Sequence, residues 1–270
     1  MRLRDLVWLG GLAGAAVLTG SAGAQETVDW SGFYAGIYAG YALDAGPASG
    51  SSIGPATADI GGTILNGTLA SSMGRINGAF GGAAAGYNYQ HNKLVLGLEA
   101  AAGLGALGKS DSSNLSLSVT DGVNTLTASY DEMSNYDINW YTSLVGRVGF
   151  AHENWLFSLK GGVVLVDASI KSTSRLQAAD PGGLAGGLIG PGGIDLPGAA
   201  NASQVLVGPT GGFGVETMIA DNVSVGAEYS YMALPSFSAP SAGLGGLFGG
   251  GGGAFSTGVH QVKATLNYHF

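Results

Sequence analysis

Charged side chains make up only 10% of this chain of 270 residues, and six of them recur on one face of short stretches with alternating polar and apolar residues. Three are acidic and three are basic, so their formal charges cancel. Buried opposite charges pair with one another, and a row of charges inside a membrane protein can also carry protons or ions. We interpret the six as an interior ion-pair network, with a gated proton or ion path as the alternative. They are Glu99, Arg147, Lys160, Glu216, Glu228 and Lys263.

Two pairings within this set follow from sequence order. Glu99 and Arg147 fall on consecutive stretches, and so do Glu228 and Lys263. Since consecutive strands of a meander are neighbours, we expect each pair to meet. Small neighbouring residues, many of them glycine, leave room for these long side chains.

No other set of residues has the spacing of a catalytic or metal site. His91 and His152 stand in short polar turns, and His260 and His269 stand in the last stretch, none with a convincing nucleophile and orienting acid. No H-E-x-x-H motif occurs, and the glycine-rich "GLGGLFGGGGG" lacks the G-K-[ST] of a phosphate loop. We therefore expect no enzyme, no metal and no cofactor. The net charge of -8 argues against nucleic acid as a partner.

The residues above are carried by eight stretches that alternate with a period of two, which is typical of β-strands. Leu, Val, Trp, Tyr and Phe gather on one face, and Gly, Ser, Asn and the six charges gather on the other. A face rich in charge and glycine is costly to bury in a dry protein core. The same face can line the polar lumen of a barrel whose apolar face contacts lipid. The stretches are residues 30–42, 78–90, 94–102, 138–151, 155–166, 209–218, 223–231 and 259–270.

Connections between these stretches alternate in length. Three are tight and polar ("QHNK", "HEN" and "ADN"), and four are long, roughly 43–75, 104–137, 167–207 and 232–259. This pattern predicts an all-β fold, an eight-stranded antiparallel up-and-down transmembrane β-barrel with short periplasmic turns and four long extracellular loops. So narrow a barrel is filled by its own side chains. A hairpin turn at Asp121-Gly122 leaves a ten-strand barrel open as the alternative, although we expect this hairpin to project outside.

Aromatic residues gather near the ends of the stretches. Such clustering is expected of the girdles at the two membrane interfaces, and ordinary β-propensity does not explain it. The predicted girdle residues are Trp30, Phe33, Tyr41, Tyr87, Tyr89, Trp140, Phe150, Trp155 and Tyr231.

The N-terminus has the layout of a secretory signal peptide. A short basic start is followed by an apolar run and by "SAGAQ", in which Ala22 and Ala24 form an A-x-A cleavage site. We predict a signal peptide over residues 1–24 and a barrel domain over residues 25–270. The chain has no cysteine, so exported protein would not depend on disulfides.

The order of the motifs resembles a known family. "DWSGFYAGIYAGY", "GAAAGYNYQ", "LVLGLEA", "GRVGFA", "NVSVGAEYSY" and the terminal "VKATLNYHF" look like the small outer-membrane barrels of alphaproteobacteria, the Omp25/Omp31-type surface antigens often labelled "porin family" and distantly similar to the OmpA barrel. The resemblance covers the stretches from Trp30 to Phe270 but not the long connections. It implies insertion by the outer-membrane assembly machinery, which reads a last strand ending in Phe. Here Val262, Leu266, Tyr268 and Phe270 would carry that signal.

These observations together predict a protein of the Gram-negative outer membrane with a plugged lumen. We expect a monomer or weak oligomer embedded in the lipid bilayer that serves envelope integrity and surface presentation. A narrow porin-like channel for small solutes is one alternative. A loop-based binder of haem, host protein or phage is the other.

Overall fold

The computed structural model describes residues 28–44, 49–185, 187–190, 192–238 and 254–270, and these form ten β-strands. No helix among them is long and apolar enough to cross a membrane. The predicted signal segment, with Ala22 and Ala24, lies outside the described residues. The strands are β1 (Gly32–Asp44), β2 (Ser49–Ile60), β3 (Thr63–Met73), β4 (Asn77–His91), β5 (Leu94–Thr120), β6 (Thr125–His152), β7 (Trp155–Ala179), β8 (Ile194–Ala220), β9 (Val223–Ser238) and β10 (Ala254–His269).

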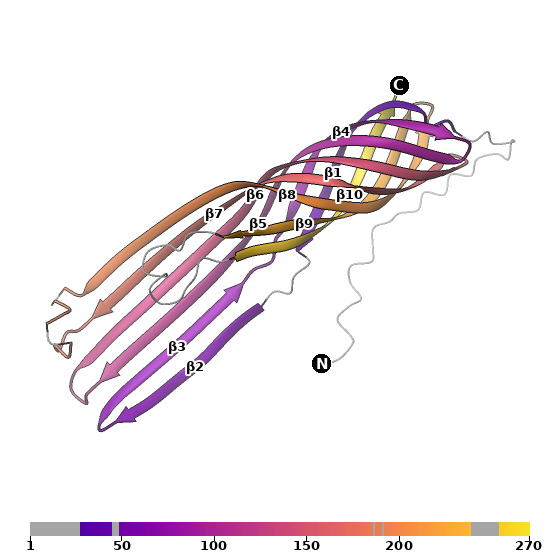
Figure 1. Ribbon diagram of the computed structural model, residues 1–270. Helices are drawn as coiled ribbons and strands as arrows, with labels where there is room; N and C mark the ends of the chain where they lie inside the picture. The colour runs from indigo at the N-terminus through magenta and orange to yellow at the C-terminus, as the bar shows by residue number, and fades with distance from the viewer. Residues whose placement is uncertain (1–27, 45–48, 186, 191, 239–253) are drawn as a thin grey trace, which may run out of the picture.

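Eight of these strands close into a hydrogen-bonded ring, and every pairing in it is antiparallel. The ring runs β1-β4-β5-β6-β7-β8-β9-β10 and returns to β1 through the pairing of β1 with β10. Figure 1 shows the barrel from the side, with a long sheet continuing from one of its ends. The chain is therefore an antiparallel barrel, as the alternation predicts.

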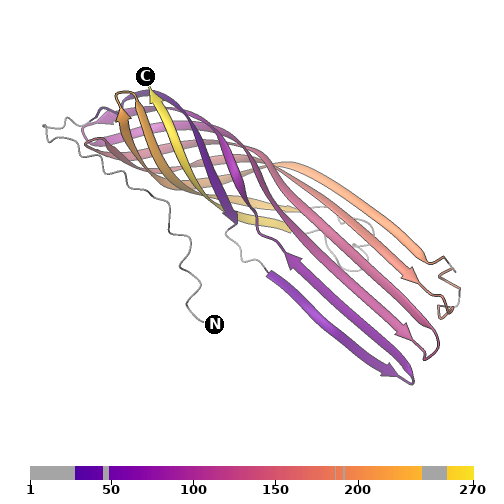
Figure 2. The same ribbon diagram turned by 180° about the vertical axis from the view of Figure 1, so that it is seen from behind.

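The strands run well beyond the ring at the end away from the short turns. β5, β6, β7 and β8 each have 25 to 28 residues and, with β2 and β3, form an open sheet projecting from the barrel, seen from both sides in Figures 1 and 2. We call this projecting part the extended sheet. The prediction of long loops over residues 104–137 and 167–207 is wrong, because most of these residues pair as strands. Pairing satisfies backbone groups that a loop would leave to water.

The first long connection, predicted as a loop over residues 43–75, also differs. It contains the hairpin of β2 and β3, which joins the extended sheet by pairing β3 with β5. The predicted turn at Asp121-Gly122 does join β5 and β6, and Asp121 Oδ1 accepts hydrogen bonds from the N–H groups of Val123 (3.0 Å) and Asn124 (2.7 Å). It lies in the extended sheet and adds no strand to the ring. Of the fourth connection, residues 239–253 lie outside the described residues.

The two faces of the ring strands have the polarity that the alternation predicts. Outward side chains such as Leu159 and Phe213 are 68% and 57% exposed, whereas Tyr34 and Tyr38 are buried inside the ring. The alternation places Ile138 outward with Trp140, but Ile138 is buried. A register shift between these two residues, where β6 pairs with β7, inverts the alternation above it.

Substitution of two adjacent glycines of β7, Gly161 and Gly162, tests how tightly the ring strands are packed. A Cβ on Gly162 would overlap the carbonyl oxygen of Leu144 on β6, whereas a Cβ on Gly161 would have no atom within 4 Å. We predict that Gly162→Ala destabilises the folded barrel by on the order of 1–3 kcal/mol, the usual cost of overpacking. Gly161→Ala is the matched control and should be nearly neutral. The temperature at which the folded gel band converts to the unfolded one measures the difference, and equal temperatures would contradict the prediction.

Candidate functional site

The interior of the barrel is the place where the predicted chemistry-bearing residues meet. The inward side chains change in character along each strand, starting from the end at the short turns. On β7, for example, Leu156 near the turn is followed inward by Lys160 and then by Val164, each four residues apart and each facing the lumen. β5 and β6 repeat the order with Val95 and Glu99, and with Ala151 and Arg147. The lumen therefore has an apolar base, a charged middle and an apolar upper part.

Lys160 stands at the centre of one half of the charged middle. Its Nζ lies 2.7 Å from Glu99 Oε2 and 2.5 Å from Glu228 Oε2, so one ammonium group bridges two carboxylates. Lys263 Nζ lies 2.8 Å from the other oxygen of Glu228. Tyr34 donates its hydroxyl to Glu99 at 2.7 Å. All these charged side chains are about 90% buried or more, so each charge depends on its partners rather than on water.

Glu216 organises the other half. Arg147 Nη2 lies 3.1 Å from Glu216 Oε2, and Glu216 Oε1 accepts hydrogen bonds from Asn267 Nδ2 (2.6 Å) and Ser224 Oγ (2.5 Å). Arg147 Nη1 also donates to the Tyr34 hydroxyl at 3.2 Å, which links the two halves. Multiple donors on one carboxylate are what a buried charge needs in order to be tolerated.

The six charged residues identified in the sequence thus lie together in the lumen, but one expected pair does not form. Lys263 meets Glu228, whereas Glu99 binds Lys160 and Arg147 binds Glu216. The partners of Glu99 and Arg147 lie further round the ring, because strand tilt brings residues from non-consecutive strands to one level.

Trp30 is not in an aromatic girdle, contrary to the prediction. Its exposure is 0%, and it packs inside the base with Val95, Ala151 and Leu156. Its ring meets the ring of His269 edge-on, with centroids 5.4 Å apart. Trp30 precedes β1, and its backbone N–H is held by Gln90 Oε1 at 2.8 Å. The segment before the first strand therefore closes the short-turn end of the lumen.

An apolar cluster fills the upper lumen, and sequence reasoning missed it by treating the inward face as wholly polar. The alternation contained the signal, since Val164, Val166 and Ile170 share the parity of Lys160. Two small cavities, of about 20 and 30 Å³, lie among the charged residues. The largest buried members of this upper cluster are Tyr38, Ile76, Phe80, Leu107, Tyr136, Ile138, Tyr141, Val164, Val166, Ile170, Leu206, Met232, Leu234 and Val259.

The other residues predicted for the girdle and the assembly signal are on the outward face. Phe33 and Tyr87 meet edge-on at 4.8 Å, and Tyr268 meets Phe270 at 5.1 Å. Phe270 is 75% exposed, and its N–H is held by the Phe33 carbonyl oxygen at 2.9 Å. The exposed set comprises Phe33, Tyr41, Tyr87, Tyr89, Trp140, Phe150, Trp155, Tyr231, Val262, Leu266, Tyr268 and Phe270.

One interior group has the composition of a hydrolytic site, which the sequence did not reveal. Ser224 Oγ lies 3.0 Å from His269 Nε2, and Glu216 Oε1 lies 3.6 Å from the same nitrogen. In a catalytic triad the acid binds the other ring nitrogen, and the nucleophile is accessible. Ser224 is fully buried, so the group is arranged as part of the polar filling. Among the described residues, no group of three or more His, Cys, Asp or Glu is placed to hold a metal ion.

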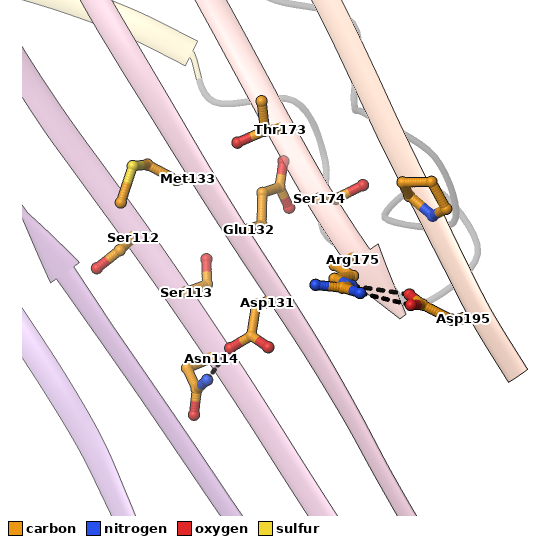
Figure 3. A pocket seen from close by; sticks show the side chains of 11 residues that line it. Ser112, Ser113, Asn114, Asp131, Glu132, Met133, Thr173, Ser174, Arg175 and Asp195 are labelled. Carbon is orange, nitrogen blue, oxygen red and sulfur yellow. Dashed lines mark hydrogen bonds and ion pairs between the residues drawn. The ribbon is translucent and has the colours of Figure 1, made fainter. Parts of the chain in front are cut away.

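A second hollow, of about 620 Å³, lies on the extended sheet rather than in the barrel. Figure 3 shows its polar lining, in which Arg175 and Asp195 are joined and Asn114 donates to Asp131. Arg175 Nε and Nη2 lie 2.7 and 2.5 Å from the two Asp195 oxygens. This hydrogen bonding and charge hold the pKa of the exposed Asp195 carboxyl below its ordinary value. The hollow therefore offers fixed polar groups at the surface.

Comparison with known proteins identifies the family. The model of the outer membrane protein beta-barrel domain matches residues 12–270. The chain belongs to this family. The outer membrane is accordingly where the barrel is embedded, with its apolar outward face against lipid. No curated protein matches the sequence.

Solved outer-membrane barrels are similar at low identity. Neisserial surface protein A is 14% identical, over 89% of this chain and 98% of its own, with a TM-score of 0.35. OprG from Pseudomonas aeruginosa is 13% identical over 91% and 99%, with a TM-score of 0.34. Ail, the attachment invasion locus protein of Yersinia pestis, is 13% identical over 89% and 99%, with a TM-score of 0.32. At these values the likeness carries no argument about function.

The two lysines of the charged middle should contribute unequally to stability. Lys160→Met removes the cation shared by Glu99 and Glu228, and we predict a loss of about 3–5 kcal/mol, typical of breaking a buried pair. Lys263→Met should cost less, because Glu228 keeps Lys160. Urea unfolding of both variants, followed by tryptophan fluorescence, measures the difference. A larger loss for Lys263→Met would count against the shared role of Lys160.

Proposed function

We propose that the protein is a closed outer-membrane barrel that supports envelope integrity and presents its extended sheet at the cell surface. Short turns would face the periplasm and the extended sheet would face outward, as in barrels with short periplasmic turns and long outer connections. The protein would work as a monomer or weak oligomer, and not as an enzyme. The motif resemblance supports placing it with the alphaproteobacterial Omp25/Omp31-type proteins.

The filling of the lumen carries this proposal. Trp30 and its neighbours occupy the base, paired charges occupy the middle, and the upper cluster occupies the mouth. A hydrated ion would have to displace apolar side chains at both ends and break buried ion pairs between them. The charges are matched in sign and number, which favours a structural network over an ion path. A narrow channel is therefore the less supported alternative.

A binding role at the surface is the second candidate function. The hollow beside Arg175 and Asp195 favours it, because it is larger than either cavity in the lumen and lies on the part of the molecule that projects from the barrel. The extended sheet would bind haem, a host protein or a phage, and the barrel would not have to change.

Conductance of purified protein tests the closed lumen. Folded monomer, identified by a gel band that shifts on heating, should give no stable unit conductance in a planar bilayer. The same preparation after heat unfolding is the control for leaks caused by detergent or aggregates. Stable, uniform conductance steps from folded monomer alone would defeat the proposal of a plugged barrel.

Deletion of Phe270 tests the proposed assembly signal. Phe270 is outward and touches neither the charged middle nor the upper cluster, so its loss should lower the amount of protein inserted in the outer membrane several-fold. Lys263→Ala, in the strand that Phe270 follows, is the control, and it should insert but melt at a lower temperature. The division of roles fails if both variants insert and melt like the parent chain.

A further inference from the structure

The two small cavities of the lumen lie on opposite sides of its central ion pairs. The cavity of about 20 Å³ lies toward the apolar base, and Ser158 and Asn267 are among the residues that line it. The cavity of about 30 Å³ lies toward the upper cluster, and its lining includes Val164 and Met232. We call them the base-side cavity and the mouth-side cavity. The charged residues that border both cavities are Glu99, Lys160, Glu228 and Lys263.

Buried polar atoms without a hydrogen-bond partner gather at these cavities. Among the described residues there are seven such side-chain atoms, and four of them belong to residues that line the two cavities. Arg147 Nε and the Tyr38 hydroxyl are at the base-side cavity, and Gln261 Nε2 and the Tyr141 hydroxyl are at the mouth-side cavity. All four side chains are at most 5% exposed. A buried polar group without a partner is costly, so its coincidence with a cavity points to a ligand.

The two nitrogen atoms are the clearer markers of the cavities. The rings of Tyr38 and Tyr141 have centroids 6.4 Å apart, so their hydroxyl groups also lie near each other. Arg147 Nε and Gln261 Nε2 are N–H donors at separate cavities. Each cavity therefore requires an acceptor of its own.

Lys263 borders both cavities and has fewer acceptors than Lys160. Its Nζ lies 2.8 Å from Glu228 Oε1 and 4.9 Å from the centroid of the Tyr38 ring. An ammonium group carries three N–H donors, and this carboxylate oxygen accepts one of them. Lys160 Nζ, in contrast, lies within 2.9 Å of three carboxylate oxygens of Glu99 and Glu228. Lys263 is thus the buried charge that further acceptors would stabilise most.

Size and charge restrict what the cavities can hold. A cavity needs about 10–15 Å³ to hold one water molecule, so the base-side cavity has room for one and the mouth-side cavity for at most two. The charged residues of each lining are matched in sign, three acids with three bases at the base-side cavity and two with two at the mouth-side cavity. A neutral ligand keeps this balance, whereas an ion would leave a net charge buried.

We propose that each cavity is a binding site for buried water, and that these waters complete the hydrogen bonding of the charged middle. Water in the base-side cavity accepts hydrogen bonds from Arg147 Nε and Lys263 Nζ. Water in the mouth-side cavity accepts them from Gln261 Nε2 and Lys263 Nζ. Its hydrogens are donated to the Glu228 carboxylate and to the tyrosine hydroxyl of the same cavity. Each water then has the two to four polar partners that ordered buried water requires.

The lifetime of these waters rests on the proposed closed lumen. Apolar side chains lie on both sides of the charged middle, so they would separate the waters from the solvent. Water held in this way turns with the protein and gives cross-relaxation of the sign seen within the protein itself.

NMR of the folded, ¹⁵N-labelled protein in detergent micelles tests the two sites directly. Cross-relaxation with water is recorded in the laboratory and rotating frames, which separates contact from proton exchange. We expect cross-peaks to water from the N–H of Arg147 Nε and the amide group of Gln261. Trp30 Nε1 is the internal control, because it is buried and unpartnered but packs in the apolar base and lines neither cavity. It should give no cross-peak, since apolar cavities stay dry.

Substitution at Ser143 tests the mouth-side cavity. Ser143 belongs to β6 and lines this cavity but not the other. Ser143→Val replaces the hydroxyl with two methyl groups, which should displace the water. The cross-peak of Gln261 should then be lost while that of Arg147 remains. Ser143→Ala is the matched control, since it leaves the cavity open and should keep both cross-peaks. The heat-shifted gel band shows that both variants are folded.

Three results would overturn the water sites: no water cross-peak at Arg147 or Gln261 in the parent protein, an equal cross-peak at Trp30, or an unchanged cross-peak at Gln261 in folded Ser143→Val. The first two need no variant, so they decide the matter even if Ser143→Val does not fold. Failure of the proposed function gives a different result. Stable conductance from folded monomer, with cross-peaks at Arg147 and Gln261 and none at Trp30, would defeat only the closed lumen.

Discussion

Pairing of β1 with β10 is the contact on which the rest of the structure depends. In lipid an open sheet edge would leave backbone groups unsatisfied, so the sheet must close. Closing it through eight strands leaves a lumen only as wide as its side chains. Every inward residue must then fit against those from the opposite wall. The abundance of glycine among the inward residues follows, because Tyr34, Tyr38 and Arg147 need the space that glycines such as Gly86 and Gly97 leave.

Closure and the charged middle depend on each other. β10 supplies Lys263, Asn267 and His269 to acids on β8 and β9, and β1 supplies Tyr34 to Glu99. Before the two terminal strands meet, those acids lack part of their hydrogen bonding. A buried carboxylate without its donors is costly, so the polar interior favours the closed ring over partly assembled forms. Matched charges thus select one register for the seam as well as filling space.

Alternation in the sequence was enough to predict the antiparallel barrel, its outward face and the identity of the six interior charges, because a period of two is a local property. The partner of each charge, such as Lys160 for Glu99, depends on the tilt of the strands. A local residue pattern does not reveal that tilt. A single bulge moved Ile138 inward. The length of β5 to β8 was missed because paired Ser- and Gly-rich segments read as loops. Trp30 was misplaced although its even number matches that of inward Tyr34 and Tyr38.

The base cluster has a spectroscopic consequence. Trp30 sits in an enclosed apolar site against His269, whereas Trp140 and Trp155 are on the outward face. Brominated or spin-labelled acyl chains quench indoles that they touch, so they distinguish outward tryptophans from the enclosed one. Trp140 and Trp155 therefore sense the bilayer, and Trp30 senses whether the segment before β1 has entered the barrel. Membrane insertion and sealing of the lumen are separable events for such probes.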